Sequence, residues 1–453
     1  MVFSSPTFIF AFLPLFFICY FLAKKVQTKN IVLLLFSLVF YAWGEHFYIF
    51  LIITSILINY YLTILMDKKK SKALLAVIVV INIFLLFSFK YANFVIDIIN
   101  SLNLVHLKNI NLSLPIGISF YTFQALSYVI DVYRGKVKVQ KKLSNLACYI
   151  VAFPQLIAGP IVRYETIEKQ LIERKTTTDG LYIGIKRFII GLSKKVLIAN
   201  NVAFIADQIF NQSASTYGFI GALIGTVAYT LQIYYDFSGY SDMAIGLGSM
   251  LGFKYDENFN RPYLANSITD FWRRWHISLS SFFKDYVYIP LGGNRVSLLK
   301  HIRNILIVWT LTGLWHGASW NFVLWGLYYA LFLILEKYVF TKLLEKTPNV
   351  IRRFITIIII MFGWILFRFS DMSELTEVIM AIVGKYGLGN IYALKYVGIF
   401  AVRFISAFVI GTLFAIVPSI KQPRYDVIYL LLFIICIIFI LVGSYNPFIY
   451  FRF

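Results

Sequence analysis

Residues 304–335 have the sequence NILIVWTLTGLWHGASWNFVLWGLYYALFLIL, which contains no Asp, Glu, Lys or Arg. Uncharged apolar runs of about 18 residues or more are typical of membrane-spanning helices, because hydrocarbon leaves backbone polar groups no partner outside the helix. The only histidine of this run is His316, which lies between Gly313 and Gly317. The run therefore predicts membrane helices that enclose one chemically conspicuous residue.

The composition of the whole chain is that of a membrane protein. Of the 453 residues, 60% are hydrophobic and 14% are charged, whereas soluble domains carry about 25% charged residues. The net charge of +21 favours basic cytoplasmic loops over nucleic-acid binding. The three cysteines show no CxxC spacing and no two histidines lie four residues apart, so we expect neither a disulfide framework nor a metal site.

Further apolar runs divide the chain into roughly 11–13 spanning or re-entrant segments. The long ones lie near 7–23, 47–66, 73–89, 304–335, 354–367, 392–418 and 427–445, and shorter or broken ones near 31–43, 114–133, 146–162, 182–210 and 217–250. No basic residue precedes the first run, so it is predicted to be a retained helix rather than a signal peptide. No soluble domain or linker is evident. We therefore expect an all-α polytopic membrane protein with a single domain over residues 1–453.

The distribution of Lys and Arg predicts the orientation in the cytoplasmic membrane. Placing the first basic cluster inside also puts the later clusters inside, provided that segment 146–162 is a re-entrant hairpin. That segment lies between two basic clusters and contains Pro154, Gly159 and Pro160. The count leaves the tail, residues 446–453, on the extracytoplasmic side.

His316 is the strongest candidate for chemistry. It lies in the sequence Trp315-His316-Gly317, five residues before Asn321, and both Trp315 and Asn321 are candidates to line its pocket or orient it. A neutral imidazole in a dry pocket suits general-base catalysis, and the flanking glycines would let a ligand or another backbone approach closely. The alternative is a histidine that hydrogen-bonds between helices and only stabilises packing.

His276 is the second candidate. The residues Phe271, Trp275, Leu279, Phe282 and Tyr286 recur at helical spacing around it and predict one amphipathic helix at the membrane interface. Two histidines could act as a pair, one as base and the other in an orienting or second step. The alternative is a member of an aromatic belt at the headgroup level.

Three polar residues interrupt another apolar stretch: Asp236, Tyr240 and Asp242. These residues could orient a histidine or contact substrate. Alternatively, the two carboxylates could form a buried ion pair with an arginine such as Arg273. The remaining histidines, His46, His106 and His301, are expected to be solvated. The tail contains Tyr450 among aromatic residues, either as part of an interfacial plug or as a phenol presented toward a cavity.

Six motifs together resemble the membrane-bound O-acyltransferase family, in particular the bacterial branch that serves alginate and peptidoglycan O-acetylation. Besides the N-terminal Met-Val-Phe-Ser-Ser, they are FPQLIAGPIVR at 153–163, YDFSGYSDM at 235–243, the region 271–280, YIPLGGNR at 288–295, LWHG at 314–317 and the tail 447–453. The resemblance implies a fold with a central funnel or tunnel. It also implies that His316 is the essential histidine and His276 the second histidine of this branch.

The function implied is acetyl transfer from cytoplasmic acetyl-CoA across the membrane to an extracytoplasmic polysaccharide, peptidoglycan being favoured over alginate. A separate esterase-like protein outside the cytoplasm would be the partner, and the tail's likeness to that of a small D-alanylation protein suggests Tyr450 as an acyl relay. D-alanyl transfer from a carrier protein is the alternative. A transporter is less expected, because we find neither paired carboxylates nor inverted repeats.

Overall fold

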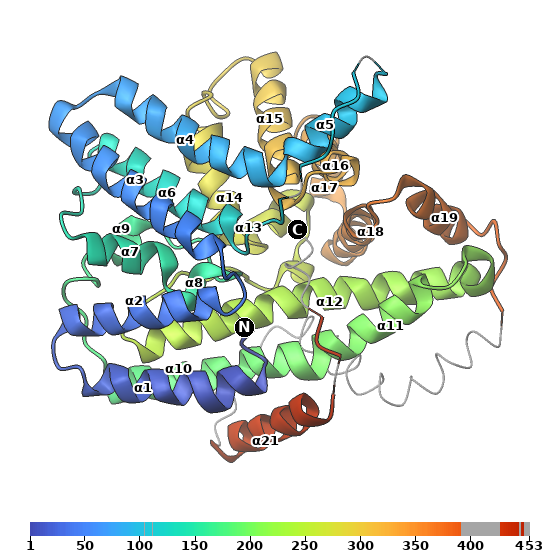
Figure 1. Ribbon diagram of the computed structural model, residues 1–453. Coiled ribbons are helices and arrows are strands. Elements are labelled where there is room, and N and C mark those ends of the chain that lie inside the picture. The colour runs from blue at the N-terminus through green and yellow to red at the C-terminus, as the bar shows by residue number, and fades with distance from the viewer. Residues whose placement is uncertain (104, 111, 391–425, 444, 448–453) are drawn as a thin grey trace. The chain divides into compact units, whose positions relative to one another are not determined.

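A computed structural model describes residues 1–103, 105–110, 112–390, 426–443 and 445–447 (Figure 1). Within these residues the chain forms helices and loops without any β-strand, which confirms the predicted all-α class. Two compact units can be distinguished: unit 1 comprises Met1–Phe188 and Tyr240–Asp256, and unit 2 comprises Ile189–Gly239 and Glu257–Phe453. Each unit draws on two separate stretches of the chain, and the single domain over residues 1–453 stays a prediction.

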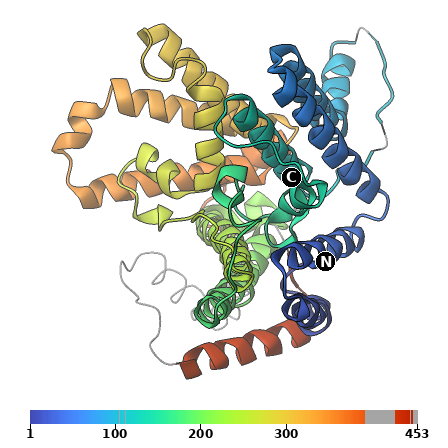
Figure 2. The same ribbon diagram turned by 90° about the vertical axis from the view of Figure 1, so that its left-hand side faces the viewer.

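Unit 1 is built from the N-terminal helices. They are η1 (Phe8–Phe12), α1 (Leu13–Leu22), α2 (Val26–Ala42), α3 (Tyr48–Lys69), α4 (Lys72–Lys90), α5 (Ala92–Ser101), α6 (Ile118–Tyr133), α7 (Leu143–Val151), α8 (Phe153–Leu156), α9 (Tyr164–Ile167) and most of α10 (Thr178–Ser193). The C-terminal end of α12 (Ala214–Met250), from Tyr240 onward, also belongs to it. Helices α3 and α4 lie side by side (Figure 2).

Unit 2 contains the candidate histidines. It holds η2 (Lys194–Ala199), α11 (Asn200–Phe210), α12 up to Gly239, η3 (Pro262–Leu264), α13 (Ile268–Arg274), α14 (Ile277–Phe283), η4 (Lys284–Tyr288), α15 (Leu298–His316), α16 (Trp320–Tyr338), α17 (Thr341–Lys346), α18 (Asn349–Arg368), α19 (Met372–Ile382) and α21 (Asp426–Val442). Helix α16 packs against both α15 and α18, and α13 packs against α16.

Most predicted segments coincide with helices. Five described helices are long and apolar enough to cross a membrane: Tyr48–Lys69, Lys72–Lys90, Thr178–Phe210, Ala214–Met250 and Asn349–Arg368. The stretch 304–335 is not one long helix, because α15 ends at His316 and α16 begins at Trp320. The stretch 146–162 breaks at Ala152 into two short helices followed by a loop. The predicted segment 392–418 lies outside the described residues.

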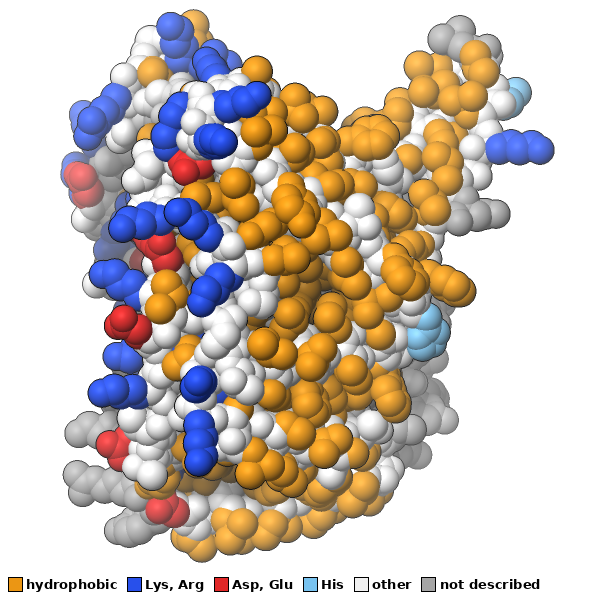
Figure 3. Space-filling view, turned by 60° about the vertical axis from the view of Figure 1, so that its left-hand side comes forward, with side chains coloured by type: hydrophobic (Ala, Val, Ile, Leu, Met, Phe, Trp, Pro, Cys, Tyr) orange, Lys and Arg blue, Asp and Glu red, His pale blue; other side chains and the backbone are white. Residues whose placement is uncertain are grey.

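The outer surface of unit 1 suits a lipid environment. Large apolar side chains are exposed on α3 and α4, among them Phe50 at 70% and Phe84 at 64%. Exposure of such residues on long apolar helices is what contact with acyl chains permits. Figure 3 shows a face on which hydrophobic side chains cover a broad area, with Lys and Arg gathered along one edge.

Candidate active site

The hairpin of α15 and α16 places His316 at a helix end that is buried in protein. A Cβ atom at Gly313 would lie 2.2 Å from the Phe322 carbonyl oxygen, and one at Gly326 would lie 2.2 Å from that of Trp309. Only glycine permits such backbone contact. Helix α15 ends at His316, and Gly317 continues in extended conformation. Gly313 therefore admits another backbone. This is one of the two possibilities, a ligand or another backbone, that the sequence left open for the glycines beside His316.

His316 lies in an aromatic cage. Its ring contacts those of Trp315, Trp325 and Phe367, with centroids 5.0 Å apart in each case. The side chain is 4% exposed. Three edge-on aromatic rings restrict the imidazole to few orientations, which is what a positioned proton acceptor requires.

Asn321 supports one wall of this cage. Its Nδ2 donates to the backbone oxygens of Leu366 at 3.2 Å and Phe367 at 3.4 Å, and its Oδ1 accepts from the Ser319 hydroxyl. The side chain is fully buried. These bonds tie the start of α16 to the end of α18, so the residue that the sequence suggested as an orienting group acts on Phe367, which contacts His316.

His276 occupies a break between two helices, so the prediction of one continuous helix from Phe271 to Tyr286 is wrong. Helix α13 ends at Arg274, Trp275 is extended, and His276 has a left-handed backbone with φ 44° before α14 begins. Left-handed conformations of non-glycine residues are uncommon and cluster at functional sites. Four of the five residues that recur at helical spacing are buried, as a helix face would be. Tertiary contacts at the break nevertheless divide the stretch into two helices.

The Trp315 indole contacts both His276 and His316. The His276 ring lies 5.6 Å from the Trp315 ring and 4.7 Å from that of Phe237, between centroids. His276 is 1% exposed, and burial lowers its pKa from 6.5 to about 3. The imidazole is therefore neutral at physiological pH and can accept a proton. Residues far apart in sequence are thus assembled around Trp315.

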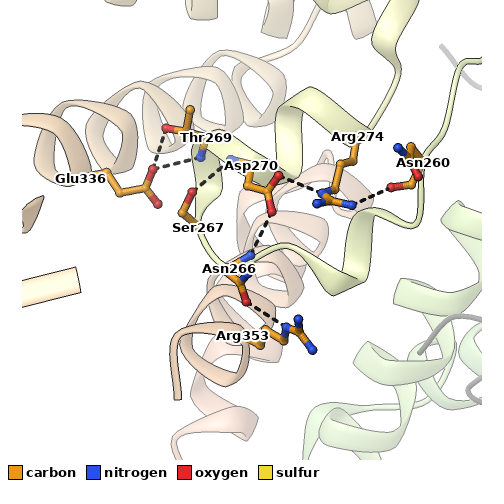
Figure 4. Close-up of polar contacts among 8 residues, drawn as sticks. All are labelled: Asn260, Asn266, Ser267, Thr269, Asp270, Arg274, Glu336 and Arg353. Atoms are coloured by element: carbon orange, nitrogen blue, oxygen red, sulfur yellow. Dashed lines mark hydrogen bonds and ion pairs between the residues drawn. The ribbon is translucent and has the colours of Figure 1, made fainter. Parts of the chain in front are cut away.

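A polar network fixes helix α13, which leads into His276 (Figure 4). Glu336 of α16 accepts from the Thr269 backbone N–H at 3.0 Å and from its hydroxyl at 2.7 Å. Asp270 accepts from Arg274 at 2.8 Å and from the backbone N–H of Asn266 at 3.2 Å. A carboxylate at the start of a helix also favours its dipole. The network joins α13 to α16, the helix that follows His316.

Both buried carboxylates form ion pairs, Asp242 with an arginine other than Arg273 and Asp236 with a lysine. Asp236 binds Lys195 at 2.6 Å, both side chains being 3% exposed, and Asp242 binds Arg187 at 2.6 Å. Arg273, the partner that the sequence suggested, is exposed on α13. Lys195 lies in η2, a π-helical turn, and such turns are frequent at functional sites. Lys195 lies within the apolar run 182–210, beside Lys194, and a cation in such a run was the signal that sequence reasoning overlooked.

Comparison with known proteins identifies the family. The model of the membrane-bound O-acyltransferase family matches residues 5–371. The chain belongs to this family. The acyltransferase is 39% identical over 93% of its length to the probable alginate O-acetylase AlgI of Azotobacter vinelandii, of which 86% is covered. The resemblance drawn from the six motifs is confirmed, as is the assignment to an integral membrane enzyme.

Two further relatives bear on the acyl group. The peptidoglycan O-acetyltransferase of Helicobacter pylori is 35% identical over 93% of the acyltransferase and 87% of its own length. The teichoic acid D-alanyltransferase of Bacillus subtilis is 34% identical, but over 49% of the acyltransferase and 59% of its own length. The O-acetylating relatives therefore match much more of the chain than the D-alanylating one.

Tyr240 and Tyr450 are the two remaining sequence candidates. Tyr240 belongs to unit 1, where its ring stacks on Phe3 with centroids 4.4 Å apart and the side chain is 2% exposed. Tyr450 lies outside the described residues. The role of each in the acyltransferase stays a prediction.

His301 of the acyltransferase is not solvated, so that expectation is wrong. Its ring nitrogens contact the hydroxyls of Tyr288, at 2.7 Å, and Tyr338, and the side chain is 2% exposed. The neighbouring Lys300 and Arg303 suggested solvent, but the helix turns them outward while residues 301, 304 and 305 face inward. His46 and His106 are exposed as expected.

Proposed function

We propose that the protein transfers acetyl groups from cytoplasmic acetyl-CoA across the cytoplasmic membrane for O-acetylation of an extracytoplasmic polysaccharide. The observation that carries this proposal is the pair of buried imidazoles, His276 and His316, which both contact the Trp315 ring in a chain of this family. The names of the relatives that match 93% of the chain support acetyl as the acyl group.

His316 is the general base of the first transfer. It takes the proton of the acceptor hydroxyl while the hydroxyl oxygen bonds to the thioester carbonyl carbon. The carbon–sulfur bond then breaks, and the thiolate leaves with the proton from the imidazolium as the free thiol. A positioned base of this kind typically contributes 10²- to 10⁴-fold in rate. His276 assists this step or serves the second half of the transfer.

The tail carries the acyl group onward in this proposal, with Tyr450 as the relay. Support comes from the described residues just before it, which contact η2 and α11: Tyr445 bonds Asp207, Asn446 bonds Asn200 at 3.2 Å, and the Pro447 carbonyl accepts from Lys195. Lys195 also binds Asp236, the neighbour of Phe237, which contacts His276. Residues 445–447 are thus held against elements that carry the candidate site.

An extracytoplasmic esterase-like protein receives the acetyl group and places it on the polysaccharide. The chain has no GxSxG motif of its own, which supports a separate partner for that step. The bias of Lys and Arg supports basic loops in the cytoplasm, where they attract the phosphates of acetyl-CoA, and a tail on the opposite side. Peptidoglycan is the favoured acceptor and an alginate-like polymer the other.

Transfer of label tests the function directly. Membrane vesicles that contain the protein and a candidate esterase-like partner would receive acetyl-CoA labelled in the acetyl group, or D-alanyl carrier protein labelled in the alanyl group. We expect label from acetyl-CoA in the polysaccharide fraction and none above background from the carrier. Label from the carrier alone would replace acetyl transfer by D-alanyl transfer.

A further inference from the structure

The segment around Asn258 closes the helix break at His276. The Asn258 carbonyl accepts from the Ile277 N–H at 3.0 Å, and the Asn260 N–H donates to the Arg274 carbonyl at 2.8 Å. Asn258 is fully buried. A left-handed backbone at a residue other than glycine costs of order 1–3 kcal/mol. The bonds from Asn258 and Asn260 to the residues on either side of His276 therefore impose this conformation on it.

The side chain of Asn258 determines which nitrogen of His276 carries the proton. Its Oδ1 accepts from the Ser278 backbone N–H at 3.2 Å and from the Ser278 hydroxyl at 2.8 Å. A backbone N–H can only donate, so the atom facing it is the amide oxygen and not the nitrogen. The same oxygen lies 3.2 Å from His276 Nδ1, which must therefore donate. In a neutral imidazole the proton on Nδ1 leaves a lone pair on Nε2.

Nε2 of His276 is buried and, within the described part of the chain, has no hydrogen-bond partner. Aromatic rings of Phe237 and Trp315 contact the imidazole from α12 and α15. A buried acceptor without a partner is costly, and such atoms occur where a ligand or reacting group completes the bonding. The lone pair is thus kept dry and available.

We propose that Asn258 is a positioning residue that holds His276 as the Nδ1–H tautomer and so makes Nε2 the proton acceptor of the second transfer. This inference rests on the proposed function. In that step Nε2 takes the proton of the incoming hydroxyl, whose oxygen bonds to the carbonyl carbon of the acyl ester. The ester oxygen leaves and recovers the proton from Nε2, so atoms and charge balance.

Charged groups on the elements packed around His276 are mostly engaged with one another. Asp236 on α12 binds Lys195 at 2.6 Å, and Asp270 on α13 binds Arg274 at 2.8 Å. The titratable His316 follows Trp315 on α15. The amide of Asn258 is neutral, so it orients the imidazole without attracting a second proton to it, as a carboxylate in its place would.

The test compares three variants in acetyl transfer across a range of pH. Asn258→Asp keeps the acceptor oxygen for Ser278 and His276 but adds charge, so it should retain activity at pH 8 while the acid limb of the rate profile moves up by about one pH unit or more. Asn258→Ala should lose at least about tenfold at every pH, because the tautomer is no longer fixed. Asn260→Ala, the matched control on the same loop, changes an exposed side chain and keeps the backbone bonds, so it should stay within about threefold of wild type with an unchanged profile.

An unchanged acid limb in Asn258→Asp, or an equal loss in Asn260→Ala and Asn258→Ala, would overturn the proposal and leave Asn258 a structural residue of the loop. Failure of acetyl-CoA as donor is a separate outcome, because the tautomer can be measured without turnover. Nitrogen-15 NMR of histidine-labelled protein in detergent, with His276→Gln for assignment, should show a protonated Nδ1 in wild type. A protonated Nε2 in wild type would refute the inference even if acetyl transfer proceeds.

Discussion

The His276 ring packs edge-on against the Trp315 indole, with centroids 5.6 Å apart and planes inclined by 68°. The same indole lies 5.0 Å from the ring of His316, its neighbour in sequence. One rigid aromatic residue thus sets the relation between a histidine at the end of α15 and another in the break before α14. A fixed relation between two imidazoles suits a transfer in two steps.

His316→Ala should abolish acetyl transfer and leave the protein inserted in the membrane. Loss of a general base costs about 10²- to 10⁴-fold in rate, whereas loss of a packing histidine would lower abundance instead. Polysaccharide O-acetylation would be measured in cells that carry only this variant, at matched membrane abundance. His46→Ala, at an exposed position, is the control. Activity above about half of wild type would rule out the assigned role.

The elements of the fold were largely predictable from the sequence, and their breaks were not. Long uncharged runs identify helices because the bilayer penalises charge and unpaired backbone in any sequence. The division of 304–335 at Gly317, however, depends on Phe322 packing where a Cβ would stand. The break at His276 likewise depends on Asn258, which is distant in sequence. Such contacts carry no local periodicity.

The candidate site was predictable in its histidines and not in its partners. A histidine in an uncharged run is conspicuous whatever the fold. Asp236 needed a cation, but choosing Lys195 over Arg273 requires knowing that α12 packs beside η2. His301 was judged by its charged neighbours, whereas the helical period places it on the inner face.

The pair of Asp236 and Lys195 should be a strong determinant of stability. Asp236→Ala leaves the buried Lys195 without its carboxylate and should destabilise the protein by about 3–5 kcal/mol. The double variant Asp236→Leu with Lys195→Met removes both charges and should recover most of that loss. Thermal unfolding in detergent, followed by tryptophan fluorescence, measures both. Equal losses in the single and double variants would mean that the charges themselves contribute little.

Stability should fall in mild acid because of His276. Its folded-state pKa of about 3 lies below the unfolded value of 6.5, so the unfolded chain binds the proton first as pH falls. The stability that this group contributes is complete above pH 6.5 and is lost progressively toward pH 3, with an upper limit of about 4–5 kcal/mol. Unfolding midpoints of wild type and His276→Gln would be compared at pH 7.5 and pH 5. The variant should show the smaller decrease, and parallel decreases would contradict the assignment.

The basic loops should face the cytoplasm and the tail the opposite side. This expectation follows from the bias of Lys and Arg. A phosphatase that folds only outside the cytoplasm, fused after Phe453, should be active. The same reporter inserted after Lys70, whose side chain is exposed between α3 and α4, should be inactive and serves as the control. An intact but inactive fusion at the tail would reverse the predicted orientation.

Tyr450→Phe should impair acetyl delivery if the phenol carries the acyl group. The substitution removes only the hydroxyl, so an aromatic plug would keep its packing and its activity. A phenyl ester is activated for onward transfer, since phenolate is a better leaving group than the alkoxide of an aliphatic alcohol. The neighbouring Phe451→Tyr, which adds a hydroxyl one residue away, tests whether position matters and is not expected to rescue Tyr450→Phe.

Mass spectrometry separates the relay from the plug directly. After incubation with acetyl-CoA, the C-terminal peptide of wild type should carry an acetyl group on Tyr450, and this species should accumulate when the esterase-like partner is absent. His316→Ala should prevent its formation, because the phenol, with a pKa near 10, needs a base to become nucleophilic. Full activity of Tyr450→Phe with no acetylated peptide would return the tail to a packing role. His316 would then act on an acceptor hydroxyl that reaches the site from outside the chain.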